Sequence, residues 1–201
     1  MAQTIVEELQ AEERILEIAR LFPRQGEWTE EDYFSLPESN RMIELSEGRL
    51  IISPSPTLEH QTISGNLFSL IRDHVKSNNL GVVVAAPMDV RLRKGIIRKP
   101  DILFMSNEHR DRLTNECLGI PDLVVEILSK SNIGEDRKRK FKQYQNAGVS
   151  EYWIVDPFQQ DIEIFTLENG AYVLFGKWGT GEIAHSKLLS GFQVAVNSVF
   201  E

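Results

Sequence analysis

Three acidic side chains stand inside apolar segments of this 201-residue chain, and their setting points to chemistry. Glu126 lies in Leu-Val-Val-Glu-Ile-Leu, Glu44 lies in Met-Ile-Glu-Leu, and Asp101 precedes Ile-Leu-Phe-Met. A carboxylate buried in an apolar strand costs much free energy unless a cation or a metal ion lies beside it. Structural roles are the alternative: a salt bridge for Glu126, a turn for Asp101 and a sheet edge for Glu44.

Strand geometry favours Asp101 over Asp122 as the partner of Glu126. Asp122 shares a strand face with Glu126, but four residues at about 3.3 Å each put their Cα atoms roughly 13 Å apart. An acid on an adjacent strand lies only about 4.8 Å away. Carboxylate oxygens, without a cluster of histidines or cysteines, are typical ligands of Mg²⁺ or Mn²⁺. The acids therefore favour a divalent-cation site.

Basic residues follow these acids along the chain. Five of them, including Arg91 and Arg93, occur within residues 91–99 without an acid among them, and a second basic run covers residues 130–142. Each run alone is typical of a solvated helix face or an edge strand. Their pairing around the acids favours contacts with phosphate groups, in which residues 91–99 would hold a nucleic-acid backbone.

A helix following Glu126 is the best source of a cation near it. Leu128 shares the strand face of Glu126, so no lysine reaches the acids from that strand position. In the next predicted helix, Arg137, Lys140 and Tyr144 are spaced to share one face. The alternative for this face is a solvated basic helix.

The predicted elements between residues 58 and 156 follow the order α-β-β-β-α-β, which indicates an α/β fold. They are a helix over 58–77, strands at Val82–Leu92, Asp101–Met105 and Asp122–Leu128, a helix over 136–147 and a strand at Glu151–Asp156. Turn signals at residues 46–48 and 168–170 predict extra β-hairpins on both flanks, and Thr29 with Asp32 predicts a capped short helix. The sheet is expected to be mixed.

The two ends of the chain differ in charge. Residues 1–47 hold 12 acidic and 4 basic side chains, whereas the remaining 154 residues hold 18 of each. An amphipathic helix is predicted over residues 3–22, and we expect residues 1–22 to be an accessory helix beside a single domain of residues 23–201. The one cysteine, Cys117, cannot form an internal disulfide, and no apolar run suits a signal peptide or a membrane span. A soluble, cytoplasmic protein without a membrane partner is expected.

Short motifs along residues 28–200 carry a resemblance to a known family. They are Glu44-Leu, Ser53-Pro-Ser-Pro through His60, Asp89-Val-Arg, Pro100-Asp101, Val125-Glu126-Ile-Leu-Ser129, Asp136-Arg-x-x-Lys140-x-x-x-Tyr144 and Gly148-Val-x-Glu-Tyr-Trp-Ile-Val-Asp156-Pro157. Together they resemble the Uma family of bacterial proteins described as restriction endonucleases, within the PD-(D/E)XK nuclease superfamily. The resemblance implies a restriction-endonuclease-like core.

The resemblance also implies roles for particular residues. Asp101 and Glu126 would be the metal-ligating acids, with Glu44 as an additional acid. The superfamily's lysine, usually two residues after the second acid, would here be Lys140 on the helix. Lys130, which stands where the family usually has proline, is a second candidate for this role.

These residues lead to the main hypothesis of a Mg²⁺-dependent endonuclease that cleaves DNA. His60 would contact a phosphate, Arg91 and Arg93 would hold the DNA backbone, and Tyr144 would pack beside Lys140. A homodimer is expected by analogy, because cutting both strands requires two sites, and the hairpin over 161–176 is a candidate interface. The alternatives are a catalytically idle nuclease fold that binds nucleic acid or protein, and a metal-dependent phosphoesterase acting on small molecules.

Overall fold

A six-stranded mixed sheet forms the centre of the fold in the computed structural model, which describes residues 22–37, 41–130 and 132–201. The strand order is β10-β9-β8-β7-β6-β3. These strands are β3 (Gly81–Ala85), β6 (Ile102–Ser106), β7 (Leu123–Ile127), β8 (Glu151–Asp156), β9 (Asp161–Glu168) and β10 (Ala171–Trp178). The pair β7 and β8 is parallel, and the other neighbours pair antiparallel, so the expectation of a mixed sheet is confirmed.

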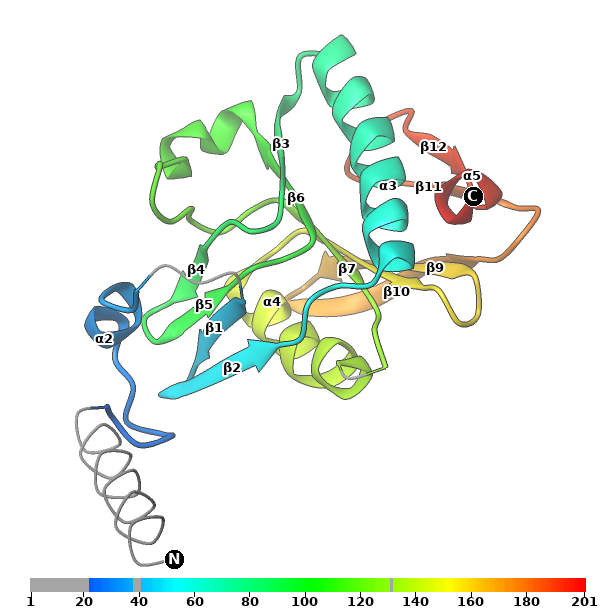
Figure 1. The fold of residues 1–201 in the computed structure, drawn as a ribbon. Helices are drawn as coiled ribbons and strands as arrows, with labels where there is room; N and C mark the ends of the chain where they lie inside the picture. The colour runs from blue at the N-terminus through cyan, green and yellow to red at the C-terminus, as the bar shows by residue number, and fades with distance from the viewer. Residues whose placement is uncertain (1–21, 38–40, 131) are drawn as a thin grey trace, which may run out of the picture.

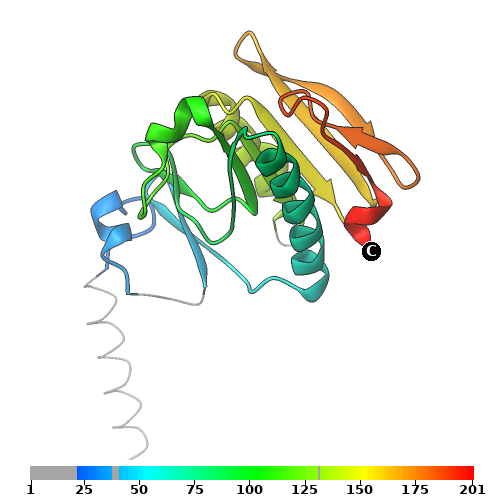
Figure 2. The same ribbon diagram turned by 90° about the horizontal axis from the view of Figure 1, so that it is seen from above.

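One face of this sheet packs against α3 (Leu58–Ser77), whose bounds match the predicted helix (Figure 1). Its buried side chains recur at helical spacing, at Ile63, Leu67, Ile71 and Val75. The C-terminal segment shares this core through β11 (Ile183–His185), β12 (Gln193–Ala195) and α5 (Asn197–Phe200). Figure 2 shows this segment beside α3, at the end of the molecule away from α2.

The other face of the sheet carries the layer that holds the candidate site. A π-helix, η2 (Glu135–Lys140), continues directly into α4 (Phe141–Ala147), and Gly148 ends the helix with a φ of 90°. A second sheet, ordered β2-β1-β5-β4, contributes to the same core. Its strands are β1 (Met42–Ser46), β2 (Arg49–Ser53), β4 (Val90–Arg93) and β5 (Ile96–Arg98).

Most predicted elements are found at or near their expected bounds. The α-β-β-β-α-β order is confirmed as α3, β3, β6, β7, α4 and β8, with the β4–β5 hairpin inserted between β3 and β6. Thr29 caps α2 (Glu30–Phe34) through a reciprocal capping box with Asp32. The polar stretch after β6 contains the short 3₁₀ helix η1 (Asn107–Arg112). The amphipathic helix predicted over 3–22 lies almost wholly outside the described residues.

The prediction of one strand over Val82–Leu92 is wrong. The segment divides into β3, in the six-stranded sheet, and β4, in the second sheet. Pro87 lies between them and has no N–H to donate to a strand neighbour, so the ladder cannot continue through it. Within the described part of the chain, no helix is both long and apolar enough to cross a membrane.

Candidate active site

Asp101, directly before β6, lies beside Glu126, which belongs to the neighbouring strand β7 of the central sheet. In the antiparallel pair of β6 and β7, Ile102 lies opposite Val125, so the next register position brings Asp101 opposite Glu126. Asp101 Oδ2 accepts a hydrogen bond from the backbone N–H of Ile127 at 2.7 Å. Both carboxylates line one cavity of about 630 Å³. By contrast, Asp122 does not line this cavity, and its Oδ2 accepts a hydrogen bond from the backbone N–H of Ser106 at 2.7 Å.

Glu126 is held by two side chains from the helix. Lys140 Nζ donates to Glu126 Oε2 at 2.8 Å, and the Tyr144 hydroxyl donates to Oε1 at 2.6 Å. Only 2% of Glu126 is exposed, and this burial raises its pKa well above the usual value despite the attraction of Lys140. A neighbouring carboxylate, Asp136, lies 3.2 Å from Lys140 Nζ and adds to the negative charge.

Lys140 is fixed by the packing of its helix. Phe141 makes edge contacts with the rings of Phe165 and Tyr172, which anchors the start of α4 on the sheet. Although burial opposes the charge of Lys140, Glu126 and the other carboxylates raise its pKa well above the usual value. The ammonium group is therefore held in place both by the core beneath it and by the acids around it.

Arg137 does not share the face of Lys140 and Tyr144 that the sequence predicted. Its guanidinium pairs with Asp156 at 3.3 Å and Glu163 at 2.7 Å instead. The reason is the π-helical geometry of η2, because a wider turn displaces residues three positions apart from a common face. Lys140 and Tyr144, four residues apart across the start of α4, still point to the same carboxylate.

Glu44 reaches the same cavity from β1 but is occupied by other partners. Arg98 donates to its Oε2 at 3.0 Å, and the backbone N–H of Lys99 donates to its Oε1 at 2.8 Å. Lys140 Nζ lies 3.8 Å from Oε1. Burial opposes the charge of Glu44, but Lys140 and Arg98 lower its pKa below the usual value. Glu44 is thus an ionised anchor for two cations.

The prediction that residues 91–99 hold a nucleic-acid backbone is wrong for Arg98, because this residue is buried. Its side chain is fully buried and forms hydrogen bonds to Glu44, Gln143, Ser46 and Glu135. A buried guanidinium with these partners joins β1 and β5 to the helix. It cannot contact a ligand on the surface.

His60 lines the cavity from the first turn of α3. Thr57 caps the helix by accepting from the His60 backbone N–H, and this fixes the first turn beside the strands. His60 Nε2 lies 3.4 Å from Asp101 Oδ2. Burial opposes its charge, yet Asp101 raises its pKa above the usual value. The role of His60 as a phosphate contact stays a prediction.

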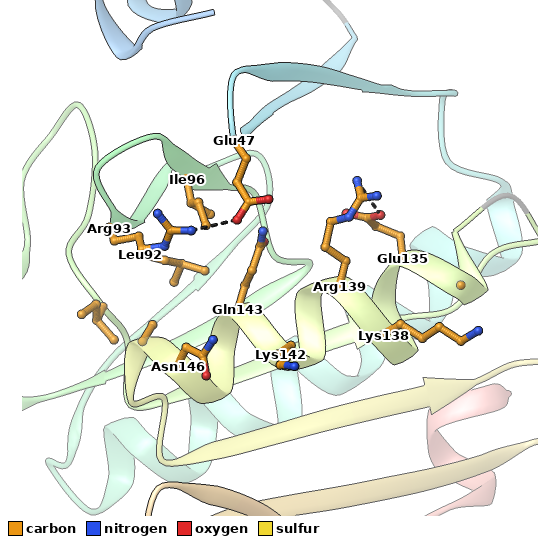
Figure 3. A pocket seen from close by; sticks show the side chains of 13 residues that line it. Glu47, Leu92, Arg93, Ile96, Glu135, Lys138, Arg139, Lys142, Gln143 and Asn146 are labelled. Carbon is orange, nitrogen blue, oxygen red and sulfur yellow. Dashed lines mark hydrogen bonds and ion pairs between the residues drawn. The ribbon is translucent and has the colours of Figure 1, made fainter. Parts of the chain in front are cut away.

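Arg91 and Arg93 lie outside the cavity that contains the acids. Arg91 pairs with Glu30 at 3.0 Å, and Arg93 pairs with Glu47 at 2.8 Å. Arg93 lines a second cavity of about 640 Å³, between the β4–β5 hairpin and the outer side of the helix (Figure 3). Lys138 and Lys142 of the helix also line this second cavity, which we call the basic cavity. Arg91 and Arg93 therefore lie apart from Asp101 and Glu126. Their contacts with a DNA backbone stay a prediction.

The donor set fits a hard divalent cation held by two protein carboxylates. Glu44 pairs with Arg98 and Glu126 pairs with Lys140 in this region, and the carboxylate of Asp101 lines the same cavity. Among the described residues, no group of three or more histidines, cysteines or acids is arranged to hold a metal ion. Mg²⁺ often takes only one or two carboxylates and keeps several waters. Asp101 and Glu126 supply two such carboxylates, and their roles as metal ligands stay predictions, as does that of Glu44.

Two site residues, Asp136 and Phe158, were not selected from the sequence, and Lys99 was predicted only as part of the basic run of residues 91–99. Asp136 carries a buried carboxylate beside Lys140, and Lys99 lines the cavity with its Nζ 2.7 Å from Asp89 Oδ1. Phe158 lines the cavity with 44% of its surface exposed. The Asp-Arg-x-x-Lys spacing contained a signal for Asp136, because residues four apart on a helix are neighbours. Phe158 gave no signal beyond its place after a strand and a proline.

The mixed central sheet with helices packed on both faces is the restriction-endonuclease-like fold that the sequence predicted. The chain belongs to the Uma2 family, whose model, described as "Putative restriction endonuclease", matches residues 30–197. A crystal structure of "a putative nuclease belonging to DUF820" from Anabaena variabilis is similar, with a TM-score of 0.72 and 20% sequence identity. The match covers 86% of this chain and 97% of that chain, and at this identity it concerns the fold. None of the curated proteins matches this chain.

Proposed function

We propose that this chain is a metal-dependent endonuclease that hydrolyses phosphodiester bonds in DNA, with Mg²⁺ or Mn²⁺ as its cofactor. The observation that carries this proposal is the convergence of Asp101, Glu126 and Lys140 in one cavity. Membership in a family described as restriction endonucleases supports the same class of reaction. Metal-assisted phosphodiester hydrolysis uses a Lewis acid, a positioned water and a cation for the developing charge, and the cavity has residues suited to holding the metal ion and supplying the cation.

The residues divide this work between them. Asp101 and Glu126 would hold the metal ion through their carboxylate oxygens. A divalent cation, when bound, polarises a phosphoryl oxygen and lowers the pKa of a water molecule. Lys140 would offset the negative charge that develops on the phosphoryl oxygens, while the Tyr144 hydroxyl keeps Glu126 oriented. His60, whose pKa is raised by Asp101, would place a positive charge beside the entering phosphate.

A second candidate function is a nuclease fold that binds nucleic acid without cutting it. The observation that favours it is the closed network around Glu126, in which Lys140 and Tyr144 already satisfy both carboxylate oxygens. In this network the protein itself provides the partners of Glu126. The two functions differ in whether a divalent cation produces strand breaks.

A nicking assay on supercoiled plasmid tests the proposal. Purified protein with Mg²⁺ or Mn²⁺ should convert the plasmid to nicked and linear forms, and EDTA should abolish the conversion. Glu126→Gln should be inactive, whereas Glu168→Gln, a change at an exposed acid on β9, should keep full activity. DNA binding without cleavage by folded protein would favour the idle fold, and hydrolysis confined to mononucleotides or small phosphoesters would favour the phosphoesterase.

Cleavage of both strands would require two sites, and we propose a homodimer for that purpose. The exposed apolar side chains of Val173, Leu174 and Phe175 on β10 support the hairpin over 161–176 as the interface. Sedimentation equilibrium of the full chain should give twice the monomer mass. A monomer at all concentrations would contradict this part of the proposal.

A further inference from the structure

The cavity that contains the acids also has an extensive apolar lining. The apolar residues that line it come from loops and strand ends, and they are Met42, Pro54, Pro56, Ala86, Pro87, Leu128, Pro157 and Phe158. The hydrolytic step uses none of these side chains. An apolar lining beside a phosphate-binding centre indicates that a non-polar part of the substrate lies there.

Phe158 is the most distinctive residue of this lining. Its ring is 44% exposed, and within the described part of the chain it stacks on no other aromatic ring. The backbone that carries it is held firmly, since Asp156 Oδ1 accepts from the N–H groups of Phe158 at 2.9 Å and Gln159 at 3.2 Å. Asp156 is fixed in turn by Arg137. A planar apolar ring is therefore presented at the cavity by a rigid turn.

The depth of the acids limits what kind of DNA can react. Only 2% of Glu126 and 14% of the Asp101 side chain are exposed, so a phosphodiester must enter the cavity to reach them. The cavity volume of about 630 Å³ suits a single small-molecule-sized group. A base that remains stacked and paired in a duplex cannot follow its phosphate inward, whereas an unpaired base can turn in and stack.

We propose that this apolar lining is a subsite for an unpaired nucleobase next to the scissile phosphate, stacked on Phe158. The substrate is then single-stranded DNA or a duplex segment that opens locally, as negative supercoiling of a plasmid favours. Base stacking on an aromatic side chain suits this role because every base has a π face, so the subsite selects strandedness and not sequence. The inference rests on the proposed function for the identity of the phosphate, but binding alone can test it.

The test compares binding of a single-stranded oligonucleotide and the duplex of the same sequence. Both are measured by fluorescence anisotropy with the full chain in EDTA, so that no cleavage occurs. The wild type should bind the single strand more tightly, and Phe158→Ala should weaken this binding roughly tenfold or more while duplex binding stays unchanged. Phe158→Trp should restore the affinity. Phe22→Ala, at an exposed phenylalanine that precedes α2 and lies away from the cavity, is the matched control and should change nothing.

A base analogue gives a second readout that does not depend on affinity. An oligonucleotide with 2-aminopurine should lose fluorescence on binding to the wild type and keep it with Phe158→Ala, because stacking quenches the analogue. Equal affinity for both strand forms, or unchanged single-strand affinity in Phe158→Ala, would overturn the subsite. Plasmid nicking that depends on Glu126 would leave the proposed function standing in that case, and binding preference without any cleavage would overturn the proposed function alone.

Discussion

Replacement of Lys140 by methionine is the sharpest test of the site, because one nitrogen lies near three carboxylates. Lys140 Nζ is 2.8 Å from Glu126, 3.2 Å from Asp136 and 3.8 Å from Glu44. Methionine keeps most of the aliphatic stem and removes only the charge. The variant therefore leaves the packing around Phe141 intact and exposes the electrostatic contribution of the lysine.

Two effects of Lys140→Met are expected, and they have separate causes. Removing one partner of a buried ion pair costs about 3–5 kcal/mol of folding stability. Part of this loss should disappear at low pH, since Glu126, whose pKa burial has already raised, can then take up a proton and become neutral. The folded state of the variant binds this proton more strongly than the unfolded chain, so its stability should decrease as pH rises above about 4.5.

The catalytic effect should appear under conditions in which the variant remains folded. If Lys140 stabilises the charge of the transition state, the single-turnover nicking rate should decrease roughly 100-fold or more, about 3 kcal/mol, with little change in DNA affinity. Urea denaturation at pH 5 and pH 8 measures the stability, and a plasmid-nicking time course measures the rate.

Lys130→Met is the matched control, because Lys130 lines the same cavity but is exposed. It should change stability by less than about 0.5 kcal/mol and should mainly alter salt-dependent DNA binding. Full activity of Lys140→Met together with loss of activity in Lys130→Met would refute the reasoning. The lysine after the strand would then act on the substrate.

Three further predictions concern the surroundings of the site. If Lys138 and Lys142 of the basic cavity both contact phosphates, changing both to alanine should reduce the slope of log affinity for DNA against log salt concentration by about 2. Titrations at several salt concentrations measure this slope, and an unchanged slope would exclude the contacts. Burial raises the pKa of Asp136 to about 6, so the contribution of Asp136 to stability decreases as pH rises from about 4 to 6. The melting temperature of Asp136→Asn should therefore increase relative to that of the wild type over this pH range, and a constant difference would contradict this. Deletion of residues 1–22 should leave a folded, active protein with equal or tighter DNA binding, and an insoluble product would show that these residues belong to the core.

The elements that the sequence predicted well are those specified by local chemistry. The capping box of Thr29 and Asp32, the helix of residues 58–77 and the hairpin at Asn169 and Gly170 each depend on residues close in the chain. The pairing of Asp101 with Glu126 was also accessible, because an isolated acid in each of two apolar strands points to adjacent strands.

The features that the sequence did not predict depend on contacts between distant segments. Arg98 reads as part of a basic surface run, but its burial is decided by Glu44 and Glu135, which are 54 and 37 residues away. The displacement of Arg137 from the face of Lys140 results from a π-helical turn, which no residue spacing announces. The place of Phe158 beside the acids follows from the packing of the β8–β9 turn and not from its own neighbours in the chain.

Glu126 and its counter-ion Lys140 belong to different elements, and this affects the cooperativity of folding. The carboxylate belongs to β7, whose five residues are all buried, and the ammonium group belongs to the end of η2. A partly folded chain with the sheet formed but the helix detached would contain a carboxylate without its counter-ion in an apolar strand. Such an intermediate is penalised by the desolvation of that charge. The sheet and the helix should therefore form together, in one transition.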